Sequence, residues 1–207
     1  MAEAMTKSAL DDALVPGRYG AATDPCGVRA QSRLGVTIAS IAARRGMTDA
    51  LRRKLASTYR IELPAGPVAT GAGPISLVGI GPDRWLWLDG GATPTKVATL
   101  AETMRDLAAV ADQTDGHRLL RLGGPRLRDL LAKGVDIDVH PTRFTVGSAA
   151  AIGVAHIPIL LWQIDRESSF EVALPRSYAE SFYAWLEESA AEFGLEVLPP
   201  ERRLARA

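Results

Sequence analysis

The stretch of residues 117–165 constrains the fold more than any other part of this 207-residue chain. Apolar residues in 117–122 predict a β-strand, and Gly123-Gly124-Pro125 predicts a turn into a short amphipathic helix. Gly134 then ends that helix, because glycine is the usual residue just past a helix C-terminus. Two apolar runs within 149–163 predict a pair of strands. This order of strand, helix and two strands indicates a fold that mixes helices with a sheet.

The chain before and after this stretch predicts further elements of the same two kinds. The first half reads as strands 35–42, 75–80, 84–88 and 108–113, with helices 49–59 and 94–107. After residue 165 come a strand over 169–174, a helix over 175–193 and an edge strand over 195–198. The first half has the order β-α-β-β-α-β, which is the split βαβ unit of ferredoxin-like folds, and the second half follows it loosely. We therefore predict an α+β fold of two ferredoxin-like lobes, with antiparallel or mixed sheets and helices on one face.

The predicted domain organisation has four segments. They are an extended N-terminal arm over 1–34, a first α+β lobe over 35–114, a second α+β lobe over 115–198, and a basic tail over 199–207. The arm is predicted because prolines and glycines recur within residues 16–27 and oppose regular structure. Such a segment lies over a surface, stays mobile, or is held by a partner. We predict Arg18 and Tyr19 of this arm as partner-contact residues.

The predicted strand 84–88 raises a second candidate interface. Its alternation places Trp85 and Trp87 on one face and two leucines on the other. Two apolar faces indicate either a strand buried on both sides or a tryptophan face that meets a partner. We favour burial in the core, and Trp85 and Trp87 remain candidates for a partner interface under the alternative.

Composition excludes several classes of function. The 24 basic and 24 acidic side chains give no net charge, so the chain lacks the basic excess typical of nucleic-acid-binding proteins. The longest apolar stretch, 149–162, is shorter than the roughly 20 residues that span a bilayer, and the acidic N-terminus does not resemble a secretory signal. A single cysteine, Cys26, forms no internal disulfide and reads as a structural residue. We expect a cytoplasmic protein with neither nucleic acid nor membrane as a partner.

No pattern of catalytic, cofactor-binding or metal-binding residues stands out. The closest metal-like spacing is Asp136-x-Asp138-x-His140, but Pro141 follows and no second histidine has ligand spacing, so a turn capped by aspartate is favoured. Gly79-x-Gly81 lacks the third glycine of a dinucleotide-binding loop and predicts a hairpin turn. The turn at Gly123-Gly124-Pro125 could hold an anion at the helix N-terminus, although tight packing is the favoured interpretation. We therefore predict no active site on this chain.

Several motifs together resemble a known family. They are Gly81-Pro82-Asp83-Arg84-Trp85-Leu86, Arg118-Leu119-Leu120-Arg121-Leu122-x-Gly124-Pro125, Arg128-Asp129-Leu130-Leu131-Ala132-Lys133-Gly134, Asp138-x-His140-Pro141, Pro158-Ile159-Leu160-Leu161-Trp162 and Pro175-Arg176-Ser177-Tyr178-Ala179. This combination is similar to the γ subunit family of heterotetrameric sarcosine oxidase, over about residues 75–190.

The resemblance implies a fold, an activity and a set of partners. The family's fold is related to the folate-binding aminomethyltransferase domain. The holoenzyme oxidatively demethylates sarcosine to glycine, with one-carbon transfer to tetrahydrofolate. Its α, β and δ subunits are the implied partners, and they carry FAD, covalent FMN, NAD, tetrahydrofolate and zinc, with no catalytic residue on the γ chain. Two alternatives are a γ subunit of a related complex such as N-methylglutamate dehydrogenase, and a free-standing folate-binding one-carbon protein.

Overall fold

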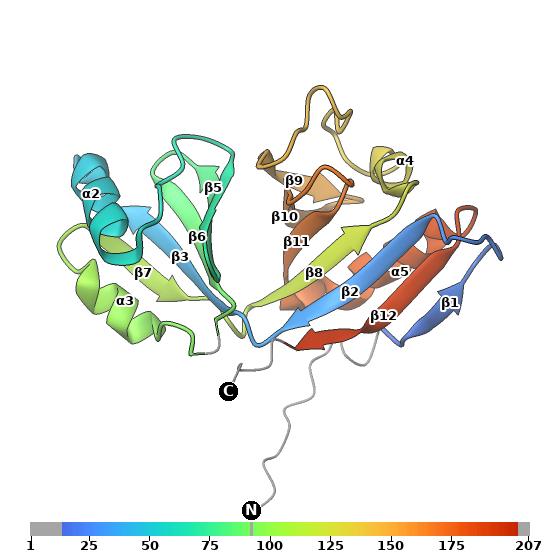
Figure 1. The fold of residues 1–207 in the computed structure, drawn as a ribbon, viewed down its shortest axis with the longest axis horizontal. Coiled ribbons are helices and arrows are strands. Elements are labelled where there is room, and N and C mark those ends of the chain that lie inside the picture. Colours follow the sequence, from blue (N-terminus) through green and yellow to red (C-terminus); the bar gives the residue numbers. More distant parts are fainter. Residues whose placement is uncertain (1–13, 92, 203–207) are drawn as a thin grey trace, which may run out of the picture.

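The computed structural model describes residues 14–91 and 93–202, which form two sheets with helices against them (Figure 1). The smaller sheet has five antiparallel strands, in the order β4 (Ala69–Ala72), β5 (Ile75–Gly81), β6 (Arg84–Asp89), β3 (Thr37–Ala43) and β7 (Ala108–Asp112). Helices α2 (Thr48–Tyr59) and α3 (Val97–Thr103) pack on its outer face. Apart from the added edge strand β4, this is the split βαβ order predicted from the sequence, so the α+β prediction is confirmed.

The larger sheet has seven strands and is built on the second half of the chain. Their order is β1 (Gly17–Tyr19), β12 (Leu195–Arg202), β2 (Val28–Leu34), β8 (His117–Gly123), β11 (Phe170–Pro175), β10 (Ile157–Gln163) and β9 (Ala149–Val154). Helix α4 (Leu127–Ala132), the 3₁₀ turn η1 (Arg176–Tyr178) and helix α5 (Ala179–Ala190) complete this half. Strands β2 and β12 pair in parallel and every other pair in this sheet is antiparallel, so the sheet is mixed.

The predicted N-terminal arm is wrong for the part that the structure describes. Strand β2 lies between β8 and β12 inside the seven-stranded sheet, and β1 pairs with β12 at its edge. Val28 and Ala30 point into the core from β2, while the alternate residues are polar. The predicted basic tail is also corrected in part, since β12 continues to Arg202. Residues 1–13 and 203–207 lie outside the described residues.

Three apolar cores hold these layers together. One fills the space between the seven-stranded sheet and helices α4 and α5, and a second lies between the five-stranded sheet and helices α2 and α3. The third joins the inner faces of the two sheets, where Leu86 and Leu88 of β6 belong to the same cluster as Leu160 and Trp162 of β10. Because apolar side chains from both sheets meet there, the two lobes share this third core.

The edges of the two sheets also meet through backbone hydrogen bonds. Ala69 N donates to Gly147 O at 2.7 Å, and Ala149 N donates to Pro67 O at 2.8 Å. These bonds form an isolated antiparallel bridge between Val68 and Ser148. We call this contact the seam. It fixes the loop before β4 against the start of β9, and it therefore forms one side of the site described next.

Candidate functional site

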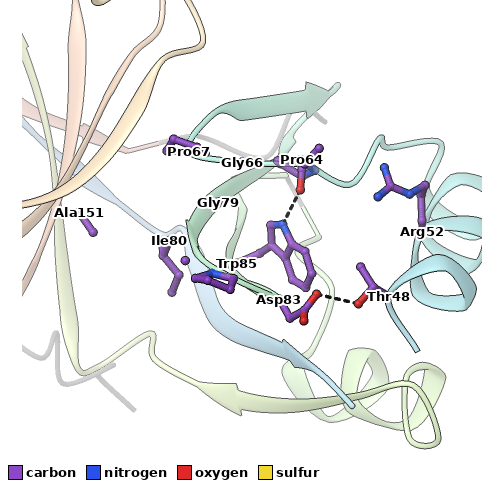
Figure 2. A pocket seen from close by; sticks show the side chains of 13 residues that line it. Thr48, Arg52, Pro64, Gly66, Pro67, Gly79, Ile80, Asp83, Trp85 and Ala151 are labelled. Carbon is purple, nitrogen blue, oxygen red and sulfur yellow. Dashed lines mark hydrogen bonds between the residues drawn. The ribbon is translucent and has the colours of Figure 1, made fainter. Parts of the chain in front are cut away.

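An open cleft of about 590 Å³ lies beside the seam (Figure 2). Its walls are the N-terminal part of α2, the 64–67 loop, the β5–β6 hairpin, and Ala151 on the edge strand β9. Most of the lining is glycine, proline and alanine, with Ile80 and Trp85 as the large apolar residues. Arg52 is the one cationic residue of the lining among the described residues. The cleft thus combines an apolar floor with a cation at its wall.

The polar side chains around the cleft are already engaged by the protein. The indole N–H of Trp85 donates to Pro64 O at 2.9 Å, and the Thr48 hydroxyl donates to an Asp83 carboxylate oxygen at 2.7 Å, as the dashed lines in Figure 2 mark. Arg52 makes a long contact of 3.4 Å to Leu63 O. These bonds help to fix the shape of the cleft.

Close backbone packing also fixes the cleft. A Cβ atom added to Gly79 would lie 2.0 Å from Gly66 O, so only glycine lets the 64–67 loop approach β5 this closely. The hairpin turn places Asp83 at a φ of 55°, a left-handed conformation that aspartate tolerates better than most residues. The hairpin interpretation of Gly79-x-Gly81 is therefore confirmed.

The tryptophan pair lies in the core of the five-stranded sheet. Trp85 is 4% exposed and Trp87 is fully buried, and Tyr59 packs edge-on against Trp87 with ring centroids 4.9 Å apart. This burial agrees with the core interpretation. A partner-contact role for Trp85 and Trp87 stays a prediction, and of the two only Trp85 lines the cleft.

Arg18 and Tyr19 lie on the edge strand β1, away from the cleft. Arg18 is exposed and contacts Glu196 at 3.5 Å and Asp24 at 3.9 Å. The Tyr19 hydroxyl donates to Val15 O at 2.7 Å, and its ring packs partly against the helix-side core. Their role as partner-contact residues stays a prediction, and the structure does not bring them together with the tryptophans.

The Asp136-x-Asp138-x-His140 pattern, whose spacing resembles that of metal ligands, folds as a capped turn, as the sequence favoured. Asp138 Oδ1 accepts a 2.8 Å hydrogen bond from the backbone N–H of His140, whose Nδ1 lies 2.8 Å from the Thr142 hydroxyl. Within residues 14–91 and 93–202, no three His, Cys, Asp or Glu side chains are grouped to hold a metal ion. Cys26 is buried, with its thiol 3.7 Å from Thr23 O.

The turn before α4 is tightly packed, as its favoured interpretation predicted. A Cβ atom on Gly124 would lie 2.4 Å from Gly27 O, and the residue has a φ of +113°. Helix α4 is six residues long, and the Arg126 side chain at its start contacts Asp129 at 2.5 Å. The turn therefore serves the approach of two backbone segments.

An ion-pair ring on the seven-stranded sheet was missed by the sequence analysis. Arg33 binds Glu171 and contacts Glu201 at 3.0 Å, while Arg121 contacts the same two carboxylates at 3.1 and 3.3 Å. The four residues come from β2, β11, β12 and β8, so the ring ties four strands together. Arg33 and Glu171 side chains are only 7% and 10% exposed. We call these four residues the charge ring.

Arg128 organises the loops on the other side of that sheet. Its guanidinium donates to Val139 O, to Gln163 Oε1 at 2.9 Å and to the Ser168 hydroxyl at 3.1 Å, and it lies 5.1 Å from the Phe170 ring centroid. Burial lowers the pKa of this guanidinium below its usual range. Arg128 is therefore a structural anchor, which its place in the sequence motif did not reveal.

Three other groups with shifted pKa values also lie outside the cleft. Burial lowers the pKa of the His117 imidazole, and it raises that of the Tyr183 hydroxyl with help from Tyr19. For Asp165, burial alone would raise the pKa, but hydrogen bonds from Ser169 outweigh it and the net shift is downward. Burial explains the shifts of His117 and Tyr183 and hydrogen bonds explain that of Asp165, so these shifts do not mark the cleft as a catalytic centre.

The fold itself is that of a known class of α+β domains. Aminomethyltransferase T of the glycine cleavage system from Bartonella henselae superposes with a TM-score of 0.56 at 14% sequence identity, over 84% of this chain and 48% of that one. A chain of heterotetrameric sarcosine oxidase from Corynebacterium sp. U-96 superposes with a TM-score of 0.70 at 26% identity, over 80% of this chain and 85% of that one. The protein thus has the α+β fold that these two proteins share.

Sequence comparison narrows this class to one family. The model of the family described as "Sarcosine oxidase, gamma subunit family" matches residues 44–192. Sarcosine oxidase subunit gamma from Corynebacterium sp. strain U-96 is 31% identical over 142 residues, which cover 67% of this chain and 68% of that protein. The subunit from an Arthrobacter species is 30% identical and covers similar shares, 67% and 69%. The chain belongs to the sarcosine oxidase gamma subunit family, as its motifs predicted. No helix in the described part of the chain is long and apolar enough to cross a membrane.

Proposed function

We propose that this chain is the non-catalytic γ subunit of a heterotetrameric sarcosine oxidase. The observation that carries the proposal is the family match over residues 44–192, together with the superposition on a chain of heterotetrameric sarcosine oxidase. In this role the chain takes part in an oxidoreductase complex that oxidatively demethylates sarcosine to glycine. Its partners are the α, β and δ subunits, and the complex works in the cytoplasm.

The cofactors of the reaction belong to the other subunits in this proposal. FAD, covalent FMN, NAD, tetrahydrofolate and zinc are assigned there, and no cofactor is assigned to this chain. The geometry of the cleft supports this division, since Trp85, Thr48 and Asp83 use their polar atoms to hold neighbouring segments. Groups committed to structural hydrogen bonds are poorly placed to bind and transform a substrate.

Co-expression with the other subunits tests the proposal. The α, β and δ chains are produced with and without this chain, with a tag on the α subunit, and glycine formation from sarcosine is measured. We expect the tagged complex to contain one copy of this chain, and we expect loss of stable assembly when it is omitted. A complex that forms and turns over sarcosine equally well without it would overturn the proposal.

A second measurement tests the non-catalytic part separately. Calorimetry with tetrahydrofolate on the purified chain is expected to show no saturable binding. Binding in the micromolar range would instead place a folate site on this chain and contradict the assignment of that cofactor to another subunit.

A further inference from the structure

Among the described residues, the outer side of the edge strand β9 is bonded only at its two ends. At the start of the strand Ala149 N donates to Pro67 O at 2.8 Å, and just past its end Ala155 N donates to Gly134 O at 3.3 Å. Both N–H groups therefore point away from β10, the strand that pairs with β9 on its inner side. The bonding from the seam stops at Pro67, because proline has no N–H to donate back to the Ala149 carbonyl.

The stretch between these two bonds leaves main-chain groups unpaired. Alternate residues of a regular strand direct their N–H and C=O groups to the same side, so those of Ala151 and Gly153 also point outward. The pairing with β10 agrees, because Gly153 lies opposite Pro158, which has no N–H for a hydrogen-bonded pair. No described residue accepts a hydrogen bond from Ala151 N or Gly153 N. We call residues 149–153 the open edge, and Figure 2 shows Ala151 of this edge at the wall of the cleft, opposite the 64–67 loop.

The side chains of the open edge do not protect it from another chain. Soluble proteins usually guard an exposed edge strand with charged residues, proline or a bulge, since unpaired N–H and C=O groups pair readily with a further strand. Strand β9 reads Ala-Ala-Ala-Ile-Gly-Val, without charge or proline, and its register with β10 is unbroken. Exposed apolar side chains adjoin its start, where Val68 of the seam is 40% exposed and Val146 is 48% exposed. An uncharged edge beside such side chains is typical of a surface that another chain covers.

The unpaired groups determine which kind of segment fits the open edge. A row of N–H donors and C=O acceptors is matched by the main chain of another extended segment, which offers the complementary row at the same spacing. A helix pairs its own main-chain groups internally and cannot supply them. Because Pro67 and Gly134 occupy the two ends, the free length admits about three paired residues. The cleft beside Ala151 has a volume of about 590 Å³ and admits the side chains of such a segment.

We propose that the open edge of β9 binds a short extended segment of a partner subunit as an added strand. The main chain of that segment accepts hydrogen bonds from Ala151 N and Gly153 N and donates one to Ala151 O, and its side chains contact the cleft and Val68. The β9 strand of a second copy of this chain does not fit, because Pro67 and Gly134 flank that strand too and would collide with their counterparts. This inference rests on the proposed function, because it takes the partner from the same complex.

Amide hydrogen exchange tests the added strand directly. Exchange of the Ala151 and Gly153 N–H groups is measured by mass spectrometry at single-residue resolution, in the four-chain complex and in the isolated chain. Both amides are expected to exchange at least about tenfold more slowly in the complex, because a hydrogen-bonded amide exchanges only when its strand opens. The amides of Ala149 and Ala155 are internal controls, since they are bonded within the chain and should be protected in both samples.

Two outcomes of this exchange measurement would overturn the inference. The first is that Ala151 and Gly153 exchange equally fast in both samples while the control amides are protected. The second is that their protection appears in the isolated chain and rises with its concentration, which would assign the open edge to a second copy of this chain.

Proline substitution tests the same bonds through assembly of the complex. Ala151→Pro removes the outward N–H and leaves the pairing of β9 with β10 intact, because proline is tolerated where the N–H of an edge strand faces outward. Gly153→Pro repeats the test at the second donor, since a Cβ atom there meets nothing within 4 Å. Ala151→Ser is the matched control, because it keeps the N–H and nearly the same size.

Dissociation of the complex is followed by native mass spectrometry over a dilution series. Each proline variant is expected to dissociate at a roughly tenfold higher concentration than the wild type, and Ala151→Ser within about twofold of it. If the proline variants and Ala151→Ser dissociate alike, the added strand is ruled out, even where the isolated chain is too unstable for the exchange measurement. Failure of the wild-type chain to join the complex would instead overturn the proposed function, so the two failures are distinct.

Discussion

Breaking the charge ring at Glu171 is the sharpest test of how the seven-stranded sheet is held together. Glu171→Leu removes the carboxylate that Arg33 and Arg121 share and leaves two cations around the one remaining carboxylate of the ring, Glu201. Removing one partner of a buried ion pair costs about 3–5 kcal/mol, since the remaining charge stays buried without compensation. Arg33 is 7% exposed but Arg121 is 35% exposed, so water screens part of the effect.

The lower end of that range, about 3 kcal/mol, is therefore expected for Glu171→Leu. In a chain of this length it corresponds to a fall in Tm of roughly 6–12 °C. The double variant Arg33→Met with Glu171→Leu keeps the pair of Arg121 and Glu201, so the ring loses charges of both signs and stays neutral. It is expected to lose only about 1 kcal/mol, less than Glu171→Leu alone.

Urea unfolding followed by tryptophan fluorescence measures these differences in the free energy of unfolding. Glu171→Leu, Arg33→Met and the double variant form a double-mutant cycle. From this cycle we expect a coupling energy between Arg33 and Glu171 of at least about 2 kcal/mol. Arg29→Met is the control, because Arg29 is exposed on β2, the strand that also carries Arg33. Its loss should change stability by less than about 0.5 kcal/mol. Additive effects of the two single substitutions would refute the account of the ring as a coupled unit.

Three further predictions concern the cleft, the loops and the pH dependence. Gly79→Ala should destabilise the chain by about 2–3 kcal/mol, because its Cβ would clash with Gly66 O, whereas Gly66→Ala meets nothing within 4 Å and should be nearly neutral in the same urea assay. Arg128→Ala should cost about 2 kcal/mol through the lost bonds to Gln163 and its neighbours, and limited proteolysis should then cut the loop after α4 faster; unchanged cleavage would contradict the anchoring role. Burial lowers the pKa of the His117 imidazole in the folded chain. In the unfolded chain this imidazole has its ordinary pKa of about 6.5, so the unfolded chain binds more protons than the folded chain as the pH drops through that value, and stability should fall there. His117→Gln should flatten this part of the stability curve measured between pH 5 and 8, and an unaltered curve would show that another group is responsible.

Local patterns in the sequence predict most of the strands and helices correctly. The hairpin of β5 and β6 follows from its apolar runs and the turn residues Gly81-Pro82-Asp83, which suit a reversal with a left-handed residue. Helix α5 follows from its apolar spacing, and Phe182 and Leu186 are buried as that spacing predicts. These elements are decided by residues near one another in the chain, which is why the pattern was enough.

The features that escaped prediction depend on contacts between distant segments. Strand β2 has a weak signal, because Val28 is the only strongly apolar residue among its buried residues Val28, Ala30 and Ser32. Its place between β8 and β12 depends on partners about 90 and 165 residues away, which no local pattern encodes. The charge ring depends on the same placement. The cleft is also non-local, since it forms where α2, the β5–β6 hairpin and β9 meet.

The position of β2 has a consequence for how the chain folds during synthesis. Residues 37–112, which contain the whole five-stranded sheet, are inserted between two neighbouring strands of the other sheet, β2 and β8. The smaller sheet can therefore close as soon as β7 leaves the ribosome. Strand β2 is made before the smaller sheet but acquires its last neighbour, β12, only after residues 195–202 have been made. Contacts of such high sequence separation form slowly, so β2 keeps one edge unpaired until β12 covers it.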